Sequence, residues 1–297
     1  MGKATRIRQQ NAREKIAAQR AAARKAETRR RMLITGGSIL AVVAIVVAFV
    51  VVKSLGSPST PQHSSAGGTP LPASVVKDIT GVPASTAEAV GRGSTGPKGP
   101  IPLNGTPLTK GGKPEVLYIG AEYCPYCAAE RWAMAVALSR FGTFSGLRGI
   151  HSSSSDAFPS TPTLTFYKTG YNSQYLVFTP VETTTVTKQA LQKTTAAQEA
   201  LLAKYDAPPY VSQADAGAIP FVDFGNKYLV SGASYSPQVL TGKTWSEVAS
   251  SLSDPKTPIS QGAVGAANMI TASICKLTNN QPATACTPAI QQLEGQL

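Results

Sequence analysis

The longest uninterrupted apolar run in the chain lies near its N-terminus, at residues 32–52. These twenty-one residues carry no charge and read MLITGGSILAVVAIVVAFVVV. As a helix rising about 1.5 Å per residue they would span about 30 Å, the thickness of a bilayer's hydrocarbon core. The competing interpretation is a cleaved signal peptide, whose apolar region would hold about 7–15 residues before a small-residue cleavage site. We therefore predict a single N-terminal transmembrane helix that contacts the lipid bilayer through residues 32–52.

The polar pattern differs on the two sides of this run. Residues 1–31 are basic, and residues 53–74 are mostly Ser, Pro, Gly and Thr, a composition typical of a flexible linker. Apolar positions return from residue 75 onward. The prediction is a basic tail at 1–31, the transmembrane helix, a flexible linker at 53–74, and one domain at 75–297.

Within the domain, a predicted strand leads directly into a predicted helix. Val116–Ile119 is a short apolar run that ends at Gly120, as expected of a buried strand. Helix-forming residues follow over 128–141, with an apolar stripe that includes Trp132. Leu147–Ile150 is the candidate for a second strand.

The rest of the domain contains further helical and strand patterns. Residues 75–90 have weak helical character, with a break at 81–83. The later patterns predict a hairpin at 163–181, a helix at 187–205, a hairpin at 221–224 and 228–230, a helix from a capping box at Thr244 to Leu252, and a helix at 260–277.

The formal net charge of +12 is concentrated in the basic tail. Residues 1–31 hold eleven Lys or Arg and two Glu, so the rest of the chain carries seventeen basic against fourteen acidic side chains. The domain is close to neutral and lacks the basic stripe that tracks a phosphate backbone, so we expect no nucleic-acid partner. Arg29, Arg30 and Arg31 precede the apolar run, and the positive-inside rule places them in the cytoplasm. We expect a single-pass protein of the cell membrane with an extracytoplasmic C-terminal domain.

Four cysteines carry the candidate chemistry, and in an exported domain they can be oxidised. Cys124 and Cys127 form a Cys-Pro-Tyr-Cys motif between the predicted strand and helix. The unpaired N–H groups and the dipole of a helix N-terminus favour a thiolate, and Pro125 fits the first turn because its N–H is not needed there. We therefore predict that Cys124 attacks disulfides as a thiolate and that Cys127 resolves the mixed disulfide.

A zinc site is the alternative use of such a motif, but zinc needs four ligands. The second pair, Cys275 and Cys286, is widely spaced, and the only histidines are His63 and His151. We favour a redox pair that needs neither a metal nor an organic cofactor. Cys275 and Cys286 are predicted to form a structural disulfide that stabilises the domain by about 3 kcal/mol. A second redox pair that passes electrons to the first is the alternative.

The segment AEYCPYC at residues 121–127 resembles the active-site segment of the thioredoxin superfamily, with the Pro-Tyr dipeptide seen in glutaredoxins. The longer stretch YIGAEYCPYCAAERW, together with FGTFSGL and ICKLTNNQPATAC, resembles a family of membrane-anchored thioredoxin-like proteins catalogued as a domain of unknown function. The resemblance covers roughly residues 75–290. It implies an α/β domain with a thioredoxin-like fold, to which we add a helical and hairpin insertion at about 155–215.

Thioredoxin-like folds also keep a cis-proline opposite the cysteine motif, where it helps to shape the substrate groove. Two prolines compete for this position. Only about ten residues separate Pro162 from the strand predicted to end near Ile150, and the fold needs a helix in that gap. Pro220 precedes a predicted hairpin and leaves room for a helix, so we choose it. The predicted substrate groove consists of Pro125, Tyr126, Ile219 and Pro220.

The sequence departs from thioredoxin at one informative position. Thioredoxin has a buried Asp in the strand before the motif as a proton relay, and the matching residue here is Tyr118. Proton transfer must then use another group or water. Glu122 lies close to the motif but is expected to be solvated or paired, and His151 is expected at the surface end of the second strand. We keep Tyr118, Glu122 and His151 as residues that could tune the cysteines.

Together these features predict a membrane-tethered thiol–disulfide oxidoreductase that acts on the thiols or disulfides of exported proteins. A membrane redox partner or a small thiol would reset the pair. One alternative is a non-catalytic thioredoxin-like module that binds a peptide or a partner at the membrane surface, and another is a metallochaperone that holds copper or zinc at Cys124. The motif does not fix the direction of electron flow, so oxidase, reductase and isomerase all remain open.

Overall fold

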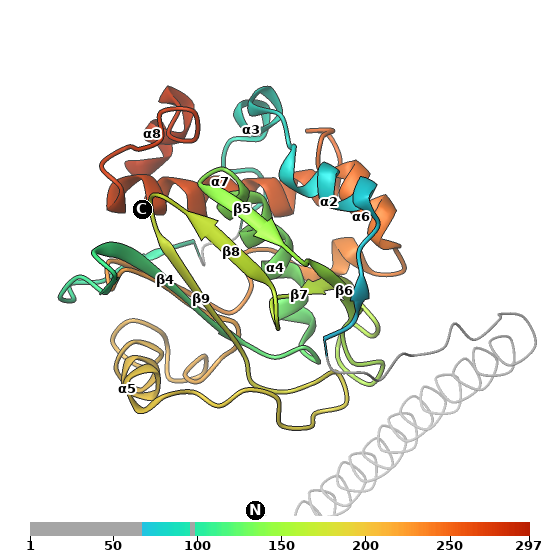
Figure 1. The fold of residues 1–297 in the computed structure, drawn as a ribbon, viewed down its shortest axis with the longest axis horizontal. Coiled ribbons are helices and arrows are strands. Elements are labelled where there is room, and N and C mark those ends of the chain that lie inside the picture. Colours follow the sequence, from blue (N-terminus) through green and yellow to red (C-terminus); the bar gives the residue numbers. More distant parts are fainter. Residues whose placement is uncertain (1–66, 96–98) are drawn as a thin grey trace, which may run out of the picture. The chain divides into compact units, whose positions relative to one another are not determined.

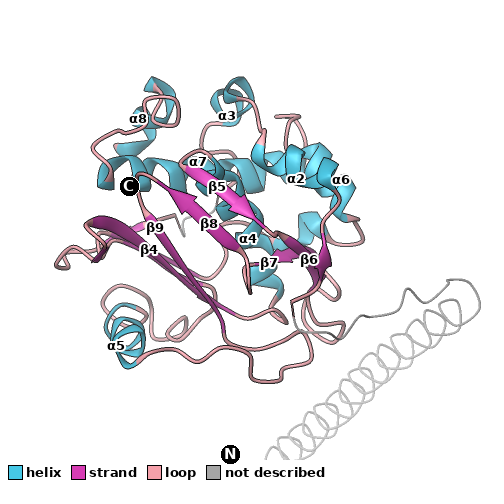
Figure 2. Ribbon diagram, in the orientation of Figure 1, coloured by secondary structure: helices cyan, strands magenta, loops and turns pink. Residues whose placement is uncertain are grey.

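A computed structural model describes residues 67–95 and 99–297 of the chain. The basic tail, the predicted transmembrane helix at 32–52 and most of the predicted linker lie outside these residues. Among the residues that are described, no helix is both long enough and apolar enough to cross a membrane. They form a mixed α/β fold (Figure 1, Figure 2).

The main sheet is built around β4 (Lys113–Gly120), the strand that leads into the cysteine motif. β4 pairs in parallel with β9 (Val177–Glu182) and antiparallel with β10 (Phe221–Phe224). Beyond β10 the sheet continues with two strands, and a further short strand pairs with the start of β4. These are β11 (Tyr228–Ser231), β2 (Ile101–Pro102) and β3 (Thr109–Lys110).

Both faces of β4 are buried, which explains its continuous apolar run. Val116 and Tyr118 belong to a large core shared with two helices, whereas the alternate residues Leu117 and Ile119 belong to a second core that includes Tyr205 of a third helix. Helices therefore cover both faces of the sheet (Figure 1). They are α4 (Pro125–Ser139), α7 (Pro258–Leu277) and α5 (Ala196–Tyr205).

Four strands lie between α4 and β9 in the sequence and form part of two smaller sheets. β5 (Gly142–Ser145) pairs with β8 (Gly170–Ser173), and β6 (Arg148–His151) pairs with β7 (Pro162–Thr165). The hairpin predicted at 163–181 is wrong, because β7, β8 and β9 each pair with a different strand.

The range predicted as an insertion, about 155–215, contains strands of three different sheets. The range 155–215 includes β9, yet β9 is a direct neighbour of the central strand. The second strand expected at 147–150 is β6, which pairs with β1 and β7 in a separate sheet. The strands β5 to β8 therefore lie between α4 and β9 in the sequence, before the strand that continues the main sheet.

The domain begins earlier in the chain than predicted. Thr69–Pro70 forms β1 and pairs with β6, and Leu71 is buried in the large core. Residues 67–74 therefore belong to the domain rather than to the linker. Their Pro- and Gly-rich composition resembles that of a linker, because composition does not reveal strand pairing. The weak helical pattern that follows forms α2 (Ala73–Thr80) and α3 (Ala84–Val90).

Most of the C-terminal elements agree with the predictions. The hairpin of β10 and β11 is confirmed, as are α7 and the capping box of Thr244 and Glu247, which begins α6 (Trp245–Ser251). The helix predicted at 187–205 is shorter, since α5 begins only after its own capping residue, Thr195. The structure adds a 3₁₀ helix at Pro237–Leu240 and helix α8 at Pro288–Glu294.

Candidate active site

Cys124 lies at the junction of β4 and α4, where it caps the N-terminus of the helix. Its Sγ accepts a hydrogen bond from the backbone N–H of Cys127 over 3.3 Å. Pro125 occupies the first turn, where the missing N–H is not needed. The same Sγ lies 3.8 Å from the carbonyl oxygen of Ile219, to which the thiol can donate. The end of the strand, the start of the helix and the loop before β10 therefore meet at this sulfur.

The two thiols of the motif differ in burial and in acidity. Cys124 is 5 % exposed, whereas Cys127 is fully buried. A hydrogen bond from the Cys127 side chain, aided by the Cys127 backbone N–H and the charge of Arg131, lowers the pKa of Cys124 to about 7 despite burial. Burial, followed by the neighbouring Cys124, raises the pKa of Cys127 well above its usual value. The site thus combines a slightly exposed thiol of lowered pKa with a fully buried thiol of raised pKa.

Cys124 should react with iodoacetamide at neutral pH. Because its pKa is about 7, the thiolate fraction and the alkylation rate should rise about tenfold per pH unit below pH 7 and level off above it. The rate is measured by mass spectrometry on the reduced protein between about pH 5 and 10, with Cys124→Ser as the control. A rate that levels off only above about pH 8.5, the pKa of a free cysteine, would contradict the lowered pKa.

An apolar rim surrounds Cys124. Tyr126 is 42 % exposed, and its ring packs edge-on against Phe158 with centroids 5.8 Å apart. Tyr123 and Ile219 are partly buried and pack against the two cysteines. Ile219, one of the predicted groove residues, therefore lies beside the two cysteines, whereas Tyr126 packs against Phe158 and is partly exposed. The part of both residues in binding a substrate stays a prediction.

The two prolines considered for the cis position have different surroundings. The Ile219–Pro220 peptide bond is cis, and Pro220 is buried directly before β10. Pro162 instead begins β7, where it pairs with His151 of β6. Pro220 therefore has the cis peptide bond that we predicted. It lies in the loop whose Ile219 carbonyl oxygen faces Cys124.

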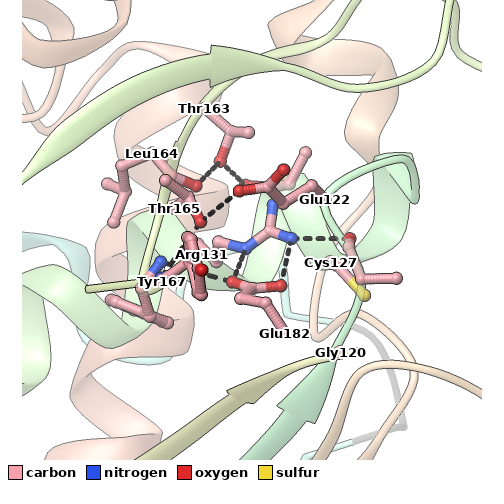
Figure 3. A network of polar contacts seen from close by, with 12 residues as sticks. Gly120, Glu122, Cys127, Arg131, Thr163, Leu164, Thr165, Tyr167 and Glu182 are labelled. Carbon is pink, nitrogen blue, oxygen red and sulfur yellow. Dashed lines mark hydrogen bonds and ion pairs between the residues drawn. The ribbon is translucent and has the colours of Figure 1, made fainter. Parts of the chain in front are cut away.

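A buried ion pair lies close to the cysteines (Figure 3). Arg131 donates from Nε and Nη2 to the two carboxylate oxygens of Glu182, over 2.8 and 2.9 Å. Both side chains are fully buried. Sequence reasoning missed this pair because the two residues are 51 positions apart. The one available signal was the position of Arg131 in a largely apolar helix, one turn after Cys127.

The three predicted tuning residues lie in different surroundings. Tyr118 is fully buried, its hydroxyl has no hydrogen-bond partner within the described part of the chain, and burial raises its pKa well above the usual value. Glu122 is paired rather than solvated: it accepts a hydrogen bond from Thr165 over 2.8 Å, and burial raises its pKa. His151 packs against the ring of Trp245 with centroids 4.8 Å apart.

Cys275 and Cys286 are joined by a disulfide, which confirms the predicted pair. Cys275 lies in the last turn of α7, Cys286 lies just before α8, and both are buried. The bridge therefore ties the last two helices together. In the described ranges, no group of three or more His, Cys, Asp or Glu side chains is arranged to hold a metal ion.

Comparison with known proteins identifies one matching family. The model of a family described as a domain of unknown function (DUF929) matches residues 100–276, a range that includes the cysteine motif, Pro220 and Cys275. No curated protein and no solved structure matches the chain. Because the family model covers more than half of the chain, the protein belongs to the DUF929 family.

Proposed function

We propose that the protein is a thiol–disulfide oxidoreductase in which Cys124 is the nucleophile and Cys127 the resolving thiol. The asymmetry of the pair carries this proposal. Cys124 caps a helix, is 5 % exposed and has a pKa of about 7, whereas Cys127 is fully buried and its pKa is raised by burial. An enclosed thiol cannot meet a protein substrate first, but it can attack a neighbouring sulfur that has already reacted.

Exchange in the reductive direction has two steps. The Cys124 thiolate attacks one sulfur of a substrate disulfide, a bond forms between the two sulfurs, the substrate S–S bond breaks, and the departing thiolate takes a proton from solvent. Cys127 then releases its proton and attacks the Cys124 Sγ, and the second substrate thiolate leaves and takes up that proton. The substrate gains the two electrons that the pair loses as its disulfide forms. The reverse sequence oxidises a substrate dithiol.

A thioredoxin-like fold with an insertion between α4 and β9 is part of this proposal. Two observations support it. The motif stands between the central strand β4 and the helix α4, and the loop that contains Ile219 brings its carbonyl oxygen to Cys124 from before β10. The resemblance to the thioredoxin superfamily implies both the position of the motif and the position of this loop.

The proposal also places the domain outside the cytoplasm, tethered to the cell membrane by residues 32–52. Its substrates are then the thiols or disulfides of exported proteins, and a membrane redox partner or a small thiol resets the pair. The Cys275–Cys286 disulfide supports this compartment, because such bonds persist mainly where the surroundings are oxidising.

Cys127→Ala should trap the first step of the reaction. Without the resolving thiol, Cys124 should accumulate mixed disulfides with exported proteins, which appear on non-reducing gels and vanish on reduction. The hydrogen bond from the Cys127 side chain is the largest cause of the lowered pKa of Cys124. Its removal should therefore raise that pKa and leave less thiolate at neutral pH. Trapping is therefore done at about pH 8.5, where even an unperturbed cysteine is about half thiolate.

The matched control for the trap is Cys124→Ala/Cys127→Ala, which keeps the Cys275–Cys286 disulfide and should give no adducts. Adducts that depend on Cys124 support the oxidoreductase. If Cys127→Ala forms none, and Cys124 reacts no faster than a free cysteine, the non-catalytic binding module becomes the better explanation.

A further inference from the structure

The buried ion pair of Arg131 and Glu182 is connected to the redox motif through the backbone. Arg131 follows Cys127 by one turn of α4, so the two side chains lie on the same face of the helix. Its Nη2 donates to the Ala121 carbonyl oxygen over 2.6 Å, and the same oxygen accepts the backbone N–H of Cys124 over 3.3 Å. One carbonyl group therefore joins the guanidinium to the cysteine that caps the helix.

The hydrogen bonds of the ion pair are unequally satisfied. Removing two charges from water is costly, and their attraction offsets this cost only where the hydrogen bonds are good. Glu182 is well satisfied, because it accepts both bonds from Arg131 and its Oε1 also accepts the Phe166 N–H over 3.3 Å. Arg131 Nη1, in contrast, has no hydrogen-bond partner among the described residues. The guanidinium can therefore interact favourably with a further negative charge, and the nearby thiols are groups that can acquire one.

The charge of Arg131 acts on both cysteines in the same direction. After the hydrogen bond from Cys127, it is one of the causes that lower the pKa of Cys124. It also lowers the pKa of Cys127, against the larger and opposite effect of burial. A positive charge favours the thiolate over the thiol, and only the reduced pair contains a thiolate. The charge of Arg131 therefore stabilises the reduced pair of cysteines more than their disulfide.

In the described part of the chain, Arg131 is the one cation among the main causes of the pKa shifts of Cys124 and Cys127. Tyr118 from β4 and Tyr123 from the loop before α4 have pKa values raised first by burial, so both stay neutral. Glu122 can only become negative, and burial raises its pKa. Glu182 from β9 is the anion that faces Arg131. Two further charged groups act on Tyr123, namely Lys188 over its ring and Asp156.

We propose that this ion pair sets the redox equilibrium of the two cysteines: Arg131 stabilises their reduced, thiolate form, and Glu182 limits that stabilisation. Both are positioning residues, since they act on the sulfurs through charge and take no part in the exchange itself. The inference rests on the proposed oxidoreductase and concerns how strongly the pair holds its electrons. A stabilised thiolate makes the disulfide form a stronger oxidant.

Substitutions of the two residues should shift the equilibrium in opposite directions. Arg131→Gln should raise the pKa of Cys124, so that the alkylation rate at about pH 6 falls about threefold. It should also move the equilibrium with glutathione, measured at about pH 8.5, about threefold toward the Cys124–Cys127 disulfide, which corresponds to about 14 mV. Glu182→Gln should raise the alkylation rate and move the equilibrium with glutathione toward the reduced pair, by similar factors. The double variant should lie between them.

Two further variants separate charge from structure, and all variants are made in the full chain. Arg131→Lys keeps the positive charge but loses the paired hydrogen bonds, so its alkylation profile should stay near that of the wild type. Arg140→Gln is the matched control, because Arg140 is a second, partly buried cation at the other end of α4, where it donates to Thr271 over 2.7 Å. Arg140→Gln should change neither the alkylation rate of Cys124 nor the equilibrium with glutathione.

Shifts in the same direction for Arg131→Gln and Glu182→Gln, or no shift in either, would overturn the inference and leave the ion pair a structural element. An Arg131→Lys variant that behaves like Arg131→Gln would do the same. If Arg131→Gln does not fold, Glu182→Gln and Arg131→Lys still test whether the charges of the ion pair set the redox equilibrium. Neither readout uses a protein substrate, so opposite shifts without trapped adducts would contradict the proposed function alone.

Discussion

Replacing Trp132 by alanine should lower the free energy of unfolding by about 3–5 kcal/mol, the range typical of removing a buried aromatic side chain. Trp132 lies in the middle of α4, is fully buried, and donates its indole N–H to the Pro162 carbonyl oxygen over 2.9 Å. Alanine would leave a cavity between α4 and β7 and a buried carbonyl without its donor, and both effects are unfavourable. Unfolding in guanidinium chloride, followed by circular dichroism, measures the loss.

Trp245→Ala is the matched control for this prediction. Trp245 also donates its indole N–H to a carbonyl oxygen, that of Ile150 over 3.0 Å, but it is only partly buried. The substitution removes a similar hydrogen bond and a smaller amount of packing, so we expect a loss of about 1–2 kcal/mol. Equal losses for the two tryptophans would contradict the conclusion that packing around Trp132 is what stabilises α4.

Some parts of the fold were predicted because residues close in sequence determine them. The apolar run of β4, followed by the motif and helix-forming residues, specifies a strand that leads into a helix. That junction alone places Cys124 at a helix N-terminus. The hairpin of β10 and β11 is specified in the same way. Gly225 and Asn226, which both adopt a positive φ (63° and 57°), are the central residues of a turn that the Lys227 N–H closes on the Phe224 carbonyl oxygen.

The parts that were not predicted depend on residues far apart in the sequence. β6 and β9 are both short strands after α4, and only packing in three dimensions decides that β9 is the one that joins β4. A charged residue in a helix is usually solvated, so Arg131 gave little reason to search for a partner. Its partner Glu182 lies at the end of β9, so the ion pair could not be predicted without the correct strand pairing.

Removing the Cys275–Cys286 disulfide should lower the free energy of unfolding by about 3 kcal/mol, because the bridge closes a loop between residues 11 positions apart and restricts the unfolded chain. The cleanest measurement uses Cys124→Ala/Cys127→Ala, in which a reductant can act only on this bridge. Unfolding the same chain with and without dithiothreitol then isolates the contribution of the disulfide. A difference below about 1 kcal/mol would contradict a structural role.

Loss of this bridge should leave the reactivity of Cys124 unchanged, because the two pairs lie near opposite ends of α4. Cys124 caps the N-terminus of α4, whereas Arg140 at its C-terminus donates to Thr271, one turn before Cys275. A helix of 15 residues is about 22 Å long, which is too far for one pair to attack the other directly. In Cys275→Ala/Cys286→Ala, the pH profile of Cys124 alkylation and the equilibrium with glutathione should match the wild type. Altered values in a folded variant would instead favour a second redox pair that passes electrons to the first.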